Sequence, residues 1–135
     1  MNNSFLISDS EVLNSDYYKN FIRINSGKGN LKIHAYAASE ALPVSGLKVV
    51  VSSVIENKKV VFYEGYTDAS GMIETLSLPA PKLSFDNLSV PMTVSYEIDA
   101  SYQGESIPTT FHINMYDGVC VVQNINYVPG GVYGG

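Results

Sequence analysis

Several side chains in this chain are of the types that could form an amide cross-link between a lysine and an asparagine. Lys32 or Lys48 could supply the amine, and Asn124 or Asn126 near the end of the chain could supply the amide. Such a bond needs a buried acid beside the pair, and Glu97 is the candidate. Glu97, however, alternates with apolar residues along its segment, which predicts that it faces solvent. The pattern therefore favours an ordinary solvent-exposed carboxylate over a cross-link.

The possible metal ligands are dispersed. A zinc site takes about four nitrogen or sulfur ligands at short spacing, whereas His34, His112 and Cys120 lie far apart. Both histidines fall on the polar phase of their segments, which predicts solvated or hydrogen-bonded imidazoles. Cys120 is the single cysteine and lies in the apolar run Gly118–Val122. We expect a small buried hydrophobe there, with a free thiol or an intermolecular disulfide as the alternative.

Hydrolytic chemistry also finds little support in the sequence. Glu97 and Asp99 share a strand phase and could be viewed as paired carboxylates, but a solvated strand face explains them far better. Serines are plentiful, yet no Gly-x-Ser-x-Gly sequence holds one at a strand-to-helix turn. We therefore expect no enzyme, no cofactor and no metal.

Composition limits the class of partner. The 135 residues suit one domain, with 16% charged residues and a formal net charge of −5. Nucleic acid and anionic membrane surfaces favour basic proteins, so we expect neither partner. No apolar run approaches the ~20 residues that span a bilayer. The N-terminus lacks a basic region followed by a long apolar run, so we expect no membrane insertion and no secretory signal.

Apolar residues alternate with polar ones along most of the chain, which is typical of half-buried strands. The clearest case is Met92–Tyr102, where six apolar or aromatic residues share one phase. Seven segments are expected as strands: Leu31–Tyr36, Leu47–Val54, Val60–Tyr66, Met72–Leu78, Met92–Tyr102, Ile107–Met115 and Val119–Val128. Turns at intervals of about 8–12 residues predict an all-β fold, an antiparallel Greek-key sandwich.

A hairpin near the middle of the chain is the strongest local signal. Asp68–Gly71 has the residues of a tight turn, because Asp and Ser bond their own backbone and Gly tolerates positive φ. Met72–Leu78 alternates after the turn. Pro79 and Pro81 lack an N–H group, so we expect the strand to end before them.

The ends of the chain differ from the middle. We divide the chain into an N-terminal arm or short helix (1–29), a β-sandwich domain (30–129) and a glycine-rich tail (130–135). Leu13, Tyr17, Phe21 and Ile24 have helical spacing, but alternation allows an extended arm equally well. We expect a hinge at Ser26–Asn30.

Three motifs resemble those of known sandwich families. Gly29–Ile33, Leu42–Val49 and Thr67–Gly71 look like the opening strands and hairpin of carboxypeptidase-regulatory-like, or transthyretin-like, domains. Leu78-Pro79-Ala80-Pro81 and the ending Gly118–Pro129 are more similar to the N-terminal module of clostridial peptidoglycan-binding and spore-cortex-lytic proteins. The resemblance covers about residues 29–129 and implies a transthyretin- or Ig-like sandwich. The hydrolytic domains of that family's larger members have no counterpart in this chain, so the resemblance implies the scaffold alone.

Together these features predict a non-catalytic structural subunit that forms homo-oligomers or homopolymers. We expect it in a bacterial surface fibre, a spore appendage or coat, or a virion-like particle, reached by a non-classical route. The expected assembly interface comprises apolar residues of both ends: Phe5, Leu6, Ile7, Leu13, Tyr17, Phe21, Ile22, Ile24, Val132 and Tyr133.

The alternative is an accessory module that binds peptidoglycan or another glycan at the spore or cell wall. Exposed aromatic rings could form its binding platform. The candidates are Tyr17, Tyr18, Tyr36, Tyr63 and Tyr116.

Overall fold

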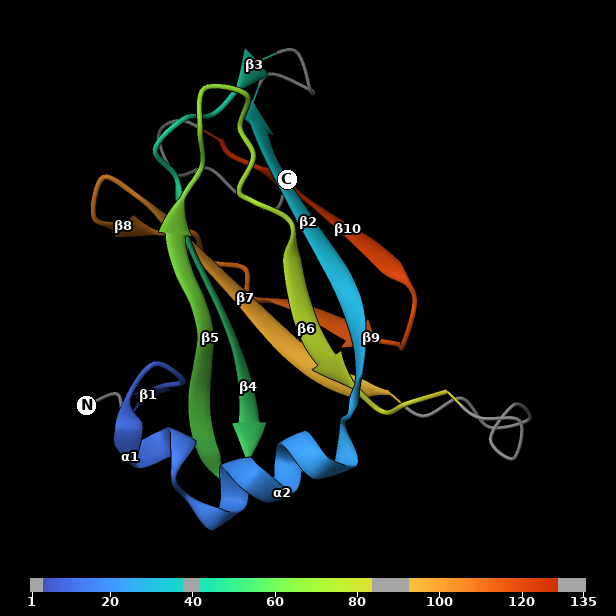
Figure 1. The fold of residues 1–135 in the computed structure, drawn as a ribbon. Coiled ribbons are helices and arrows are strands. Elements are labelled where there is room, and N and C mark those ends of the chain that lie inside the picture. Colours follow the sequence, from blue (N-terminus) through green and yellow to red (C-terminus); the bar gives the residue numbers. More distant parts are fainter. Residues whose placement is uncertain (1–3, 38–41, 84–92, 129–135) are drawn as a thin grey trace.

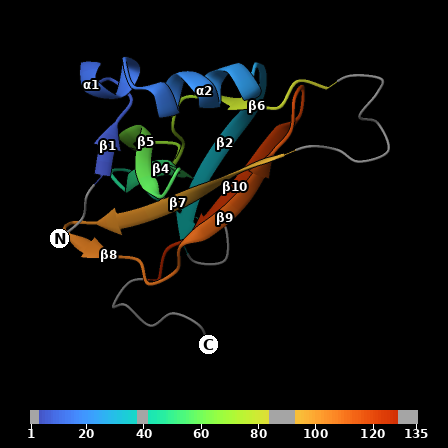
Figure 2. The same cartoon turned by 90° about the horizontal axis from the view of Figure 1, so that it is seen from below.

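The computed structural model describes residues 4–37, 42–83 and 93–128 of the chain. Two β-sheets lie face to face, and two short helices lie across one end of them (Figures 1 and 2). The predicted all-β sandwich is therefore confirmed. The described residues form ten strands, several of them very short.

The larger sheet, which we call sheet A, has its strands in the order β1-β5-β4-β7-β8, with β9 also paired to β7. All its pairs are antiparallel except β1 with β5. Its strands are β1 (Ser4–Leu6), β4 (Lys48–Ile55), β5 (Lys58–Tyr66), β7 (Val94–Tyr102), β8 (Glu105–Ser106) and β9 (Phe111–Met115).

The smaller sheet, sheet B, is organised around β2 (Gly27–Ala37). The last strand, β10 (Cys120–Asn126), pairs with one side of β2 and runs parallel to it. Two short strands pair antiparallel with the other side, β3 (Leu42–Pro43) and β6 (Leu76–Ala80). The parallel β10 departs from the wholly antiparallel arrangement predicted from the sequence.

The main core lies between the sheets and follows the predicted alternation. Along β2, Leu31, Ile33 and Ala35 are fully buried, and along β7, Tyr96 and Ile98 are fully buried. Residues between them face outward, as strand geometry requires. The phase of these two strands is thus predicted correctly from the sequence.

The N-terminal segment folds onto the sandwich of its own chain. It contains β1, α1 (Ser10–Leu13) and α2 (Asp16–Ile24). Both of the conformations that the sequence allowed, extended and helical, are therefore present. Ser15 caps α2, its Oγ accepting from the N–H of Tyr18 at 3.3 Å. Phe21 and Val12 pack with Val60 of β5 in a second hydrophobic cluster. The predicted hinge at Ser26–Asn30 is wrong, because β2 starts at Gly27 and runs through it.

Asp68–Gly71 form the turn that the sequence indicated. The Asp68 Oδ1 accepts from the N–H groups of Ser70 and Met72, at 2.8 and 3.1 Å. Gly71 has a φ of +77°, and its carbonyl accepts from the N–H of Ala35 on β2 at 2.7 Å. The turn is thereby tied to sheet B.

The strand after this turn starts later and ends later than predicted. Met72 makes only an isolated bridge to His34, and β6 is Leu76–Ala80 with Pro79 inside it. Proline is tolerated there because β6 is an edge strand, so the missing N–H faces away from β2.

Replacing Thr67 by valine should destabilise the fold. The buried Thr67 hydroxyl donates to the Val44 carbonyl at 2.6 Å and accepts from the Leu47 N–H at 3.0 Å. Thr67→Val leaves both backbone groups unpaired and should lower the free energy of unfolding by about 1–3 kcal/mol. Thr67→Ser keeps the hydroxyl and is the matched control. Equal urea midpoints for the two variants would contradict this role.

A second prediction concerns Asp117. Its carboxylate accepts from the N–H groups of Leu83 and Lys28, each at 3.0 Å, and these bonds lower its pKa below the ordinary 3.8. Stability from this group is full above pH 3.8 and is lost as the pH falls through the lower folded-state pKa. Asp117→Asn should therefore be less stable than the parent at neutral pH, and the difference should shrink in acid. Unfolding curves against pH measure it, and a constant difference would contradict it.

Candidate interaction surfaces

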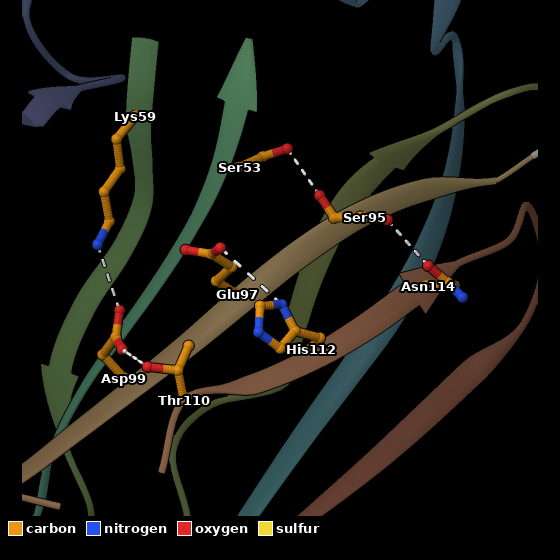
Figure 3. A network of polar contacts seen from close by, with 8 residues as sticks. All are labelled: Ser53, Lys59, Ser95, Glu97, Asp99, Thr110, His112 and Asn114. Carbon is orange, nitrogen blue, oxygen red and sulfur yellow. Dashed lines mark hydrogen bonds and ion pairs between the residues drawn. The ribbon is translucent and has the colours of Figure 1, made fainter. Parts of the chain in front are cut away.

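The outer face of sheet A carries a network of polar side chains, drawn in Figure 3. Lys59 of β5 reaches across β4 to Asp99 of β7, with 3.4 Å between Nζ and Oδ2. The Thr110 hydroxyl donates to the other oxygen of Asp99 at 2.7 Å. Lys59 and Asp99 are both more than a third exposed, so the pair is screened by water and adds little stability.

The same network continues towards β9. His112 Nδ1 lies 3.9 Å from Glu97 Oε1, and the two side chains form an ion pair only when the imidazole is protonated. The Ser95 hydroxyl donates to the Asn114 side-chain oxygen at 2.9 Å. Ser53, buried on the inner face, donates to the Ser95 carbonyl at 2.7 Å. These contacts join three strands of sheet A through their side chains.

A groove of about 490 Å³ lies over the part of this face next to β1 and β8. Its floor includes Val50, Val61 and Ile107, while Lys48 and Glu64 form a second ion pair at its side, 3.7 Å apart. Each cation in the groove already has a carboxylate beside it. None of the described residues that line the groove is aromatic, so it lacks the stacking platform expected of a glycan site.

The tyrosines proposed for glycan binding lie on separate elements. Tyr17 and Tyr18 are on α2, Tyr36 on β2 and Tyr63 on β5, and Tyr116 follows β9. Tyr18 is half-buried, and burial raises its pKa. The structure does not gather these rings into one platform.

The residues considered for an amide cross-link are also separated. Lys32 and Asn124 lie on neighbouring strands of sheet B, where β10 pairs with β2, and both are exposed. Glu97 lies on the outer face of sheet A, beside His112. The other candidate lysine, Lys48, shares sheet A with Glu97, but Asn124 and Asn126 are both on sheet B. The buried constellation that this chemistry requires is therefore not assembled.

Cys120 is exposed, which corrects the prediction that it is buried. It begins β10, where Val121, Gln123 and Ile125 form the inward phase and Cys120, Val122 and Asn124 form the outward one. The inward and outward positions could not be distinguished in the sequence, because valines occupy both faces of this strand. Among the residues the structure describes, no three His, Cys, Asp or Glu side chains cluster as a metal site would require.

The exposure of Cys120 is directly measurable. Its thiol should react with Ellman's reagent in the native protein at a rate close to that in denaturant, because no folded layer covers it. One equivalent of released thiolate is the expected yield. Reaction only after unfolding would contradict the exposed position.

The free side of β10 is an edge of the smaller sheet in the described part of the chain. β10 pairs with β2 on one side, and no described strand pairs with its other side. The strand contains no charged residue, no proline and no glycine. Val122 is 59% exposed, and Val119 just before the strand is 43% exposed. Proteins usually protect such edges with charges, prolines or bulges.

The apolar residues predicted as an interface fall into three groups. Phe5, Ile7, Tyr17 and Phe21 belong to the second hydrophobic cluster, where they contact their own sandwich. Leu6, Leu13, Ile22 and Ile24 have 36% or more of their surface exposed. Val132 and Tyr133 lie outside the described residues. The outward residues of β10 were missed, although the uncharged run Val119–Ile125 was a visible signal.

Comparison with known proteins yields structural likeness only. No protein-family model matches the sequence, and no curated protein matches it. A 5-hydroxyisourate hydrolase from Klebsiella pneumoniae has a similar fold, with 24% identity and a TM-score of 0.49, over 76% of this chain and 92% of that one. Transthyretin from Sparus aurata has 14% identity and a TM-score of 0.44, over 72% and 90% of the two chains.

A third similar structure is the dioxygenase domain of a dioxygenase–carbohydrate-binding protein fusion from Streptomyces sp. SirexAA-E. It has 10% identity and a TM-score of 0.47, over 75% of this chain and 79% of that one. The fold of this chain is a two-sheet β-sandwich, and these three structures are similar to it. Our prediction that the chain is not an enzyme is contradicted by these likenesses, because 5-hydroxyisourate hydrolase is an enzyme. At such identities the likeness shows the fold alone and brings no activity to this chain.

Within the described residues, no helix has the length and apolar character that a membrane span requires.

Proposed function

We propose that this chain is a structural subunit that associates with copies of itself through the edges of its sandwich. The observation that carries the proposal is the unprotected edge of β10, which has no charge and exposes Val122. An edge strand of this kind offers a row of unpaired N–H and C=O groups to another strand. The simplest partner is the same edge of a second copy.

Two copies joined by this edge would form a continuous sheet. If the two β10 strands run antiparallel, a two-fold axis relates the copies and the contact closes as a dimer. The outward side chains of β10 would then lie side by side, and Val119 and Val122 would shield each other from water. Each ~40 Å² of apolar area covered at such a contact contributes ~1 kcal/mol.

The wider setting is part of the proposal. We infer that the chain is most closely related to the N-terminal module of clostridial peptidoglycan-binding and spore-cortex-lytic proteins, from Leu78-Pro79-Ala80-Pro81 and the Gly118–Pro129 ending. On that basis we propose a place in a surface fibre, a spore appendage or coat, or a virion-like particle. The exposed Leu6 and Leu13 of the N-terminal segment are further candidate contacts there.

A lysine at Val122 tests the edge contact. In Val122→Lys, charges of like sign approach each other across the paired edges. The dissociation constant of the dimer should therefore rise at least ~10-fold. Val54→Lys is the matched control, because Val54 is 58% exposed, close to the 59% of Val122, but lies on sheet A, where it pairs with Lys59 of β5. Mass against concentration by light scattering measures the effect.

The contrary outcomes are distinct. A parent protein that stays monomeric at high concentration would overturn the proposal, and so would equal masses for the two lysine variants. Co-sedimentation of monomers with purified sacculi, combined with indifference to Val122→Lys, would instead support the peptidoglycan-binding alternative.

A further inference from the structure

A second groove runs along the free side of β6, between that strand and α2. It has a volume of about 400 Å³. Its lining is mainly apolar and aromatic, with Ile7, Tyr18, Ile22, Phe62, Leu78 and Pro79, and also includes the uncharged polar residues Asn25, Ser26 and Ser77. Lys28 is the one charged residue among those that line it in the described part of the chain. The groove is thus suited to an uncharged, apolar occupant.

The direction of the β2 backbone shows which side of β6 is free. The Lys28 carbonyl accepts from Gly118 and the Asn30 N–H donates to Val119, each at 2.9 Å, so both residues turn their backbone groups towards β10. The residue between them, Gly29, must therefore face β6, where it pairs with Leu78.

The same alternation then applies to β6. Leu78 directs its backbone groups to β2, so Ser77 and Pro79 direct theirs outward. Pro79 has no N–H, and its carbonyl accepts from the Tyr96 hydroxyl at 2.6 Å. Ser77 lies beside the groove, and no described residue pairs with its outward N–H and C=O, which can accept an added strand.

We propose that this groove takes an extended segment from the glycine-rich tail of a second copy, with Val132 and Tyr133 as its anchors. No side chain of the segment Gly130–Gly135 is charged. Valine and tyrosine both favour strands, and alternate side chains of an added strand point to opposite faces, so one anchor enters the groove. Backbone pairing to Ser77 would set the register.

The tail of the same copy is too short to fill this groove. The Tyr127 N–H donates to the Tyr36 carbonyl at 2.8 Å, which places the start of the tail at the far end of β2. The groove lies at the level of Gly29, ~23 Å away along β2 and ~10 Å across two strand spacings. Val132 follows Tyr127 by five residues, which span at most ~18 Å when fully extended.

This geometry makes the contact head-to-tail. The tail of one copy leaves from one end of sheet B, and the groove receives it at the other end, so each joint leaves a new tail and a new groove free. A heterologous joint of this kind extends without limit unless rotation closes a ring. The inference rests on the proposed self-association, because it adds growth to the dimer formed at β10.

The experiment compares full-length variants by light scattering over a range of concentrations. Ile22→Glu places a charge at the mouth of the groove, whereas Ile24→Glu, on the same helix but outside the groove lining, is the matched control. Val132→Asp combined with Tyr133→Ser removes the anchors. We expect Ile22→Glu and the tail variant to stop at the dimer, while Ile24→Glu grows as the parent does.

Mixing the two blocked proteins completes the test. Ile22→Glu dimers keep their tails and the tail-variant dimers keep their grooves, so the mixture should regain growth that neither protein shows alone. A synthetic peptide of residues 129–135 should shorten parent assemblies by competing for the groove.

The outcomes separate this inference from the proposed function. Loss of mass in Val122→Lys with parent-like growth of Ile22→Glu would leave the β10 contact standing and overturn the tail contact. Head-to-tail growth that persists in Val122→Lys and disappears in Ile22→Glu would support the tail contact and overturn the β10 contact. A mixture that fails to regain growth overturns the tail contact in either case.

Discussion

Strand β2 is the element on which the arrangement of sheet B depends. It pairs with β10 on one side and with β3 and β6 on the other, and its Ala35 N–H holds the turn at Gly71. This close packing requires glycine at its start. A Cβ on Gly29 would lie 2.5 Å from the Tyr116 carbonyl oxygen, a contact that only a backbone shift could relieve. The strand can therefore approach β9 and its following turn only because this position lacks a side chain.

In sheet B, β2 is the strand that is paired on both sides, and the strands beside it are edge strands. Both flanks of β2 are occupied, so the unpaired backbone lies on the outer sides of β10 and β6. In sheet A, by contrast, β1 pairs with Lys59, Val60 and Val61 on the outer side of β5, and charged side chains lie across the outer face of the sheet. The difference explains why the proposed contacts are both on the smaller sheet, although the larger one has the more elaborate polar network.

The sequence predicts some elements well because the signal is local. The alternation of Tyr96 and Ile98 with charged residues determines the face that β7 buries, and Asp68 bonds its own backbone within the turn. The exposed Cys120 could not be predicted in this way, since valines on both phases remove the alternation. The partner and direction of β10 depend on contacts with residues 30–36, far away in sequence. The candidate surfaces were predicted only in part for the same reason: they are defined by which edges stay unpaired.

The N-terminal segment illustrates how tertiary packing selects among residues of one amphipathic helix. Its helical spacing marks Tyr17 and Phe21 as an apolar face, which could serve either another copy or its own domain. A segment tethered by a few residues meets its own sandwich at an effective concentration of the order of millimolar. Intrachain docking therefore prevails at lower protein concentrations, and exchange between copies must first break the cluster around Phe21 and Val60. The edges of β10 and β6 need no such opening, because no described element covers them. Association through these edges has the smaller kinetic barrier, and this difference favours strand addition over arm exchange as the first step of assembly.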